Sequence, residues 1–176
     1  MKNADFVRFS SAICLMFASA TLAGAQELSN PGPIVAAFNE TCRRGFPDVA
    51  MVREQAEARG WAELSGQMVV SFSNPRLGAA DLPQVLFKGD MTLIMTAHSP
   101  VRRRSTCAIS VPAEQTLDTG GLARAVSAAL GGAEASMEME RGVEQASWQL
   151  KSGLVVKASV GKSGDKRRAH LTVLTS

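Results

Sequence analysis

The sequence predicts an α+β domain with a mostly antiparallel sheet, an N-terminal helical hairpin and one further helix packed on that sheet. Apolar residues recur at helical spacing in three segments, each followed by a glycine stop. The other segments alternate over hairpin-length steps between turn residues, which is typical of antiparallel strands, because parallel strands need long crossovers. The length of 176 residues, with 45% hydrophobic and 20% charged residues, suits one packed domain.

The first segment has the composition of a secretory signal peptide. Lys2 and Arg8 provide a positively charged start, and the run Ser11–Leu22 is uncharged and mostly apolar. The small residues Ala23-Gly24-Ala25 then form a cleavage site before Gln26. We therefore expect a bacterial protein that is periplasmic or secreted.

This interpretation divides the chain into three parts. Residues 1–25 form a cleavable secretory signal peptide, 26–33 a flexible mature N-terminus, and 34–176 the single domain. Two alternatives remain open, an uncleaved anchor and a lipoprotein, although Cys14 lies too early in the apolar run for lipid attachment. No later stretch has the roughly 20 apolar residues that a transmembrane helix needs, so we expect no membrane span after cleavage.

Two cysteines remain after residue 25, Cys42 and Cys107. An even count in an exported chain predicts one disulfide. The alternative is a redox or nucleophilic thiol pair, but there is no C-x-x-C spacing.

Three helices are predicted in chain order. Pro33 begins the first, which runs to Arg44 before the stop at Gly45. Pro47-Asp48 begins the second, which Gly60 ends. The third begins at Asp118 or Thr119 and runs to about Leu130 before two glycines.

The remaining segments are predicted strands. Met137 and Met139 alternate with Glu138 and Glu140, so we expect the methionines to face the core and the glutamates to face solvent. A basic loop is expected between the last two strands. The predicted strands are Gln67–Ser73, Val85–Lys88, Met91–His98, Ser105–Val111, Ala133–Glu140, Val143–Leu150, Leu154–Val160 and Ala169–Thr175.

Composition argues against two classes of partner. The formal charge of +3 falls to +2 when Lys2, Asp5 and Arg8 leave with the signal, which does not favour nucleic acid. Tyrosine is absent and aromatic content is 5%, so a site that stacks on sugars or bases is not expected. The chain also lacks the common catalytic motifs, and we expect no cofactor.

Two histidines are candidates for metal binding or catalysis. His98 and His170 are both expected near strand ends on outward-facing positions, where a solvent-facing role is the simpler interpretation. Pairs such as Met91/Met95 and Met137/Met139 have the softness that copper prefers, but the same spacing is typical of a core.

Two basic segments are the candidate binding residues. If they lie at one end of the sheet, they form a surface for an anion, because arginine offers a forked set of donors. The first is Arg102, Arg103 and Arg104, and the second is Lys162 with Lys166, Arg167 and Arg168.

Taken together, these features predict an exported, non-catalytic protein that binds another protein or an anionic envelope component. Two alternatives stay open. One is a small exported hydrolase whose site requires His98 or His170 in a cleft beside a serine or carboxylate. The other is an envelope metal-handling protein that requires a histidine close to methionine sulfurs.

Overall fold

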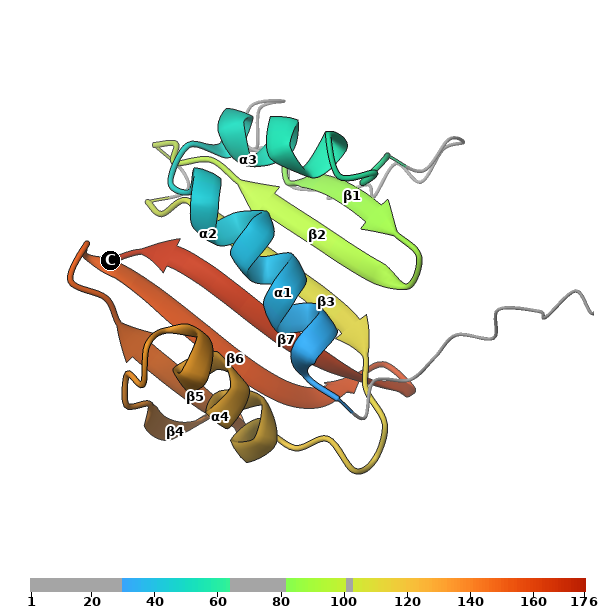
Figure 1. Cartoon of the computed structure of the whole chain (residues 1–176), viewed down its shortest axis with the longest axis vertical. Coiled ribbons are helices and arrows are strands. Elements are labelled where there is room, and N and C mark those ends of the chain that lie inside the picture. The colour runs from blue at the N-terminus through green and yellow to red at the C-terminus, as the bar shows by residue number, and fades with distance from the viewer. Residues whose placement is uncertain (1–29, 64–81, 101–102) are drawn as a thin grey trace, which may run out of the picture.

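The computed structural model describes residues 30–63, 82–100 and 103–176. These residues form an α+β fold with a seven-stranded antiparallel sheet in the order β1-β2-β3-β7-β6-β5-β4 (Figure 1). The predicted fold class is therefore confirmed. The predicted strand Gln67–Ser73 lies outside the described residues.

The N-terminal helical hairpin is present, with a break in its first arm. The bent arm consists of α1 (Gly32–Glu40) and α2 (Cys42–Gly45), and α3 (Val49–Glu57) returns beside it. The hydroxyl of Thr41 donates to the carbonyl of Ala37, a bond that competes with the helical pattern and bends helices. Because α1 begins at Gly32, the last two residues of the segment expected to be flexible belong to a helix.

Two local features position the return helix. Asp48 caps α3, where its carboxylate accepts hydrogen bonds from Ala50 N at 2.9 Å and Met51 N at 3.1 Å. A Cβ atom at Gly45 would lie 2.8 Å from Val52 N, so only glycine allows α2 and α3 to approach this closely.

The strands follow one another as antiparallel neighbours, with one helix between the two sets. The first set is β1 (Gln84–Lys88), β2 (Met91–Thr96) and β3 (Thr106–Pro112), and α4 (Thr119–Ala129) follows it. The second set is β4 (Ser136–Glu140), β5 (Val143–Gln149), β6 (Leu154–Ser163) and β7 (Lys166–Thr175). The last strands of the two sets, β3 and β7, pair in the middle of the sheet.

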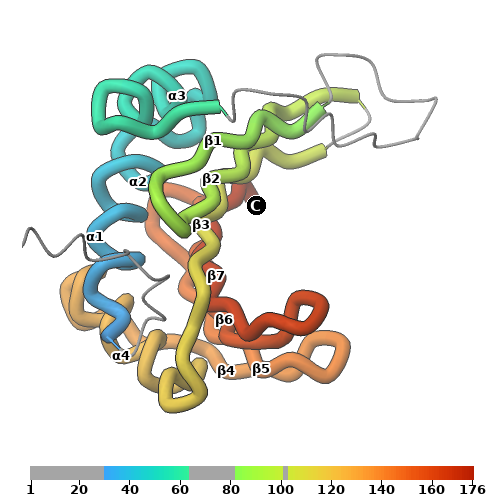
Figure 2. Tube along the Cα trace, turned by 90° about the vertical axis from the view of Figure 1, so that its right-hand side faces the viewer, coloured from blue at the N-terminus to red at the C-terminus, as the bar shows by residue number. Residues whose placement is uncertain are grey.

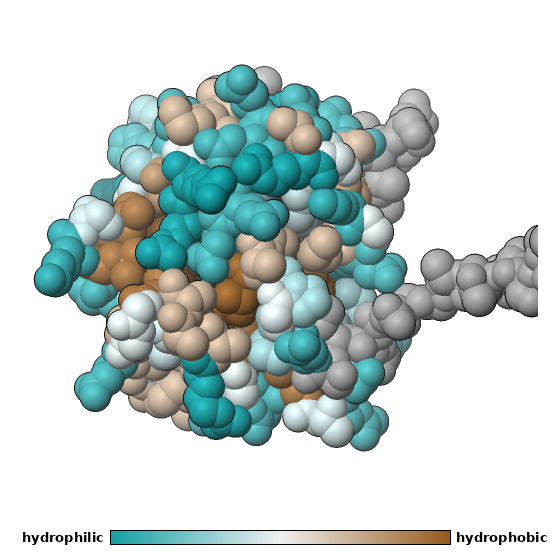
Figure 3. All heavy atoms as spheres, in the orientation of Figure 1, coloured by the Kyte–Doolittle hydropathy of each residue, from teal (hydrophilic) through white to brown (hydrophobic). Residues whose placement is uncertain are grey.

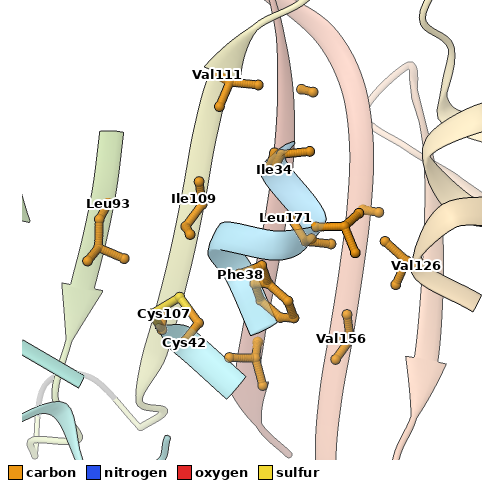
Figure 4. Close-up of a cluster of buried hydrophobic side chains, with 14 of the residues drawn as sticks. Ile34, Phe38, Cys42, Leu93, Cys107, Ile109, Val111, Val126, Val156 and Leu171 are labelled. Atoms are coloured by element: carbon orange, nitrogen blue, oxygen red, sulfur yellow. A yellow bond between two sulfur atoms is a disulfide. The ribbon is translucent and has the colours of Figure 1, made fainter. Parts of the chain in front are cut away.

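The described helices α1 to α4 lie on the same side of the sheet, and the two edges of the sheet curve toward the opposite side (Figure 2). The apolar core lies between the helices and the sheet, where Phe38 packs near Ile109, Leu171 and Val156 (Figure 4). Hydrophobic residues are visible among the polar ones on the face that carries the helices (Figure 3). The opposite side of the sheet, which no described helix covers, is called the open face below.

The predicted disulfide joins the helical hairpin to the middle of the sheet. Cys42 in α2 is bonded to Cys107 in β3, with a Cα–Cα distance of 5.6 Å (Figure 4). Both cysteines are completely buried. Cys107 has the inward orientation that its alternation with Ile109 predicted.

The prediction that Met137 and Met139 are core residues is wrong. Their side chains are 47% and 68% exposed, although they lie on the same side of the sheet as the core. The reason is that α4 packs on β5 and β6 and leaves the edge strand β4 uncovered. Glu138 and Glu140 are exposed as expected.

The predicted basic loop between the last two strands is also wrong. Ser163 pairs with Lys166, so β6 and β7 extend through the basic residues and only Gly164 and Asp165 form the turn. Gly164 adopts a φ of +62°, which a two-residue hairpin turn requires and glycine tolerates. The basic residues therefore occupy fixed positions in a sheet.

Among the described residues, no helix is both long enough and apolar enough to cross a membrane.

Candidate anion-binding site

The open face is polar because every second residue of the central strands points away from the core. Register aligns Thr92, Ser110, His170, Ser159 and Gln145 in one row across β2, β3, β7, β6 and β5. This row, called the polar row below, contains uncharged hydrogen-bonding side chains with one histidine in the middle.

Arg168 lies beside the polar row and binds to it. Its Nε donates to Ser110 Oγ at 2.7 Å, and its Nη2 donates to Ser110 O at 3.2 Å and to Thr92 Oγ1 at 3.4 Å. All of these acceptors are neutral. The guanidinium is therefore held in place without a carboxylate that would neutralise it.

A cavity of about 720 Å³ opens at the end of the sheet where the β6–β7 hairpin meets the β1–β2 turn and the chain leaving β3. Four basic residues and two acidic residues line this cavity, called the cationic hollow below. Its charged lining residues are Asp90, Lys162, Asp165, Lys166, Arg167 and Arg168.

Among the described residues, no acidic side chain forms an ion pair with the four basic groups of the cationic hollow. The ion pairs of the described residues involve only Arg53 and Lys157 as cations, and neither belongs to the hollow. Arg167 donates through Nη2 to Leu117 O at 2.8 Å, while its Nε is buried with no acceptor among the described residues. The hollow therefore carries excess positive charge and unused donors, which suit an anionic group.

The two predicted basic segments do not meet. Thr106 pairs with Leu174 and Pro112 pairs with Arg168, so the chain before β3 and the β6–β7 hairpin lie at opposite ends of the sheet. Arg103 and Arg104 are exposed at the end away from the hollow, and Arg102 lies outside the described residues. Only Lys166, Arg167 and Arg168, with Lys162, converge on one cavity.

The histidines differ in their surroundings. His98 is exposed, as expected. His170 lies inside β7 rather than near its end, because β7 begins at Lys166. It is half-buried on the open face, and this burial, together with the charge of Arg168, lowers the pKa of His170 below its ordinary value. The imidazole is therefore neutral at neutral pH.

His170 lines a second, smaller cavity of about 280 Å³ on the open face, called the His170 hollow. Its lining includes two other members of the polar row, Gln145 and Ser159, and the charged residues Glu140, Arg141 and Lys162. Glu140 Oε2 accepts a hydrogen bond from Lys157 Nζ at 3.2 Å, and Gln145 Oε1 accepts one from the same nitrogen at 2.9 Å.

The sheet separates His170 from Met95. Met95 is buried on the helix-covered face, as are Cys107 and Val173 in the same row, whereas His170 lies on the open face. The described residues contain no group of three or more histidine, cysteine, aspartate or glutamate side chains that could hold a metal ion.

The contribution of neutral residues to these cavities was not predicted from the sequence. Ser159 and Gln145 are unremarkable alternate positions of predicted strands, and only the register places them beside His170. Asp90, in the turn between β1 and β2, was not among the candidate binding residues.

Comparisons of the chain with protein-family models, with curated proteins and with solved structures gave no significant match.

Proposed function

We propose that this protein is exported and acts by binding an anionic envelope component in the cationic hollow. The observation that carries the proposal is the convergence of Lys162, Lys166, Arg167 and Arg168 on one cavity without an acidic partner among the described residues. Arg167 and Arg168 donate to neutral acceptors, and the four basic residues of the hollow outnumber its two carboxylates, Asp90 and Asp165, so an anionic ligand is favoured.

Two further features support export. The segment 1–25 has the composition of a signal peptide, although it lies outside the described residues. The Cys42–Cys107 disulfide is compatible with an oxidising compartment. Intact mass measurement of the exported protein tests both, since the proposal requires a chain that starts at Gln26 and is alkylated at two cysteines only after reduction.

Neutralising the cationic hollow is expected to weaken binding to a polyanion. We expect Lys162→Gln/Lys166→Gln to lower the affinity for labelled polygalacturonate by about tenfold or more, because each lysine near an anionic surface contributes about 1 kcal/mol. Fluorescence anisotropy at a fixed, low salt concentration measures the change.

The matched control removes two charges at the other end of the sheet. Arg103→Gln/Arg104→Gln changes the net charge equally but leaves the cationic hollow intact. We expect it to retain nearly wild-type affinity. Equal losses in the two double variants would contradict the proposal, because they would indicate a non-specific charge effect.

A second candidate function, an exported hydrolase, is favoured by one observation. His170 lines one hollow with Ser159 and Glu140, which meets the condition that the sequence set for a catalytic histidine. Within the described residues, however, no hydrogen bond joins His170 to either residue, and Glu140 is bound by Lys157. A serine nucleophile needs a base within hydrogen-bond reach.

Ester hydrolysis distinguishes the two candidates. The binding proposal predicts that p-nitrophenyl acetate is cleaved at the same rate by the wild type and by His170→Gln. Turnover that exceeds the buffer rate and is lost in His170→Gln would favour the hydrolase instead.

A further inference from the structure

The cationic hollow and the His170 hollow are neighbours on one surface. Lys162 lines both of them. Gly161 of the His170 hollow is the direct cross-strand partner of Arg168, which lines the cationic hollow. His170 also lies two residues from Arg168 on the same side of β7. A ligand with two different parts can therefore contact both hollows at once.

The two hollows offer different chemistry. The cationic hollow is lined by four basic residues, whereas the His170 hollow combines the charged residues Glu140, Arg141 and Lys162 with neutral groups of the polar row. These neutral groups are His170, Ser159 and Gln145. A neutral imidazole, a hydroxyl and an amide each donate and accept hydrogen bonds. Vicinal hydroxyl groups, which also both donate and accept, match this set better than a second charge does.

Gly161 places no side chain at the junction between the hollows. A Cβ atom at Gly161 in β6 would lie 3.4 Å from Val143 Cγ1 in β5. The open face between these two strands therefore has room for little more than a methyl group. The sheet also curves around this side (Figure 2). A curved sheet surface fits an elongated small ligand better than it fits the plane of a membrane.

We propose that the ligand is an acidic saccharide, with its carboxylate or phosphate in the cationic hollow and its sugar hydroxyls in the His170 hollow. This inference rests on the proposed function and specifies the class of ligand for the same surface. The lining residues of the two hollows include no phenylalanine, tyrosine or tryptophan, so recognition relies on hydrogen bonds and charge and not on stacking against a large ring. This agrees with the low aromatic content of the chain.

Three probes separate the contributions of charge and hydroxyls. Trigalacturonate carries carboxylates on sugar rings, tricarballylate carries three carboxylates without a sugar, and maltotriose is a sugar of matched length without charge. We expect the mature protein to bind trigalacturonate about tenfold more tightly than tricarballylate, which corresponds to one or two additional neutral hydrogen bonds. Maltotriose should bind too weakly to detect by isothermal titration calorimetry.

Removing hydrogen-bonding groups from the polar row should abolish this preference. In Gln145→Ala/Ser159→Ala, we expect the affinity for trigalacturonate to fall to that for tricarballylate, while tricarballylate binding stays unchanged. Ser147→Ala is the matched control, because Ser147 lies on the open face of β5 but does not line the His170 hollow. Its preference should equal that of the wild type.

The possible outcomes separate the two proposals. If no carboxylate probe binds, the proposed function fails and this inference fails with it. Equal affinities for trigalacturonate and tricarballylate would overturn the inference that the ligand is a saccharide, but not the proposed function. Binding to phosphatidylglycerol vesicles that is tighter than binding to trigalacturonate, and that is unchanged in Gln145→Ala/Ser159→Ala, would overturn the saccharide inference in favour of a lipid surface.

Discussion

Replacing Cys42 and Cys107 together with alanine is expected to lower the free energy of unfolding by about 4 kcal/mol. The disulfide closes a loop with a sequence separation of 65, and in the chain-entropy model a loop of this size restricts the unfolded chain by about that amount. Both residues are fully buried between α2 and β3, so the smaller alanines also reduce core packing. Urea unfolding followed by circular dichroism measures the loss.

Reductant provides the control for this prediction. The wild type unfolded in the presence of dithiothreitol should lose most of the same stability, whereas the double variant should be insensitive to it. A double variant as stable as the oxidised wild type would mean that helix packing alone holds the hairpin on the sheet.

Replacing Trp148 with alanine should cost about 3–5 kcal/mol, the range for removing a large buried aromatic side chain. Trp148 is almost fully buried in β5, and α4 packs on that strand. Its Nε1 donates to Ser127 Oγ at 3.1 Å, so the ring also joins α4 to the sheet through a hydrogen bond. The midpoint of urea unfolding reports the change.

Trp148→Phe separates the two contributions of this residue. It keeps most of the apolar volume and loses the hydrogen bond, so we expect a cost of about 1 kcal/mol beyond any packing change. Gln149→Ala, at an exposed position of the same strand, should stay within about 0.5 kcal/mol of the wild type. A loss in Trp148→Ala no greater than that in Gln149→Ala would show that α4 does not depend on this contact.

Local patterns predicted the elements but not their ends. Helix starts such as Asp48 and Asp118 were predictable because their side chains satisfy the first free N–H groups of each helix. The full length of β6 and β7 was not predictable. Lys162, Lys166 and Arg168 lower the apparent β-propensity of their segments, but cross-strand pairing stabilises these residues in the sheet.

Burial depends on what covers a face, and alternation cannot supply that information. Met95 and Met139 occupy the same side of the sheet in strands of similar pattern, yet Met95 is buried and Met139 is exposed. The difference is that Met95 lies in β2, with a strand on either side, whereas β4 is an edge strand outside the reach of α4.

By itself, the sequence determined the fold class and the pairing of the only two cysteines after residue 25, since these depend on local spacing and on the number of cysteines. The tertiary structure alone decided which candidates share a surface. Register brings Arg168 beside Ser110 and places His170 between Ser110 and Ser159, while it sends Arg103 and Arg104 to the other end. Register is a property of pairs of strands distant in sequence, so no single segment encodes the site that they form.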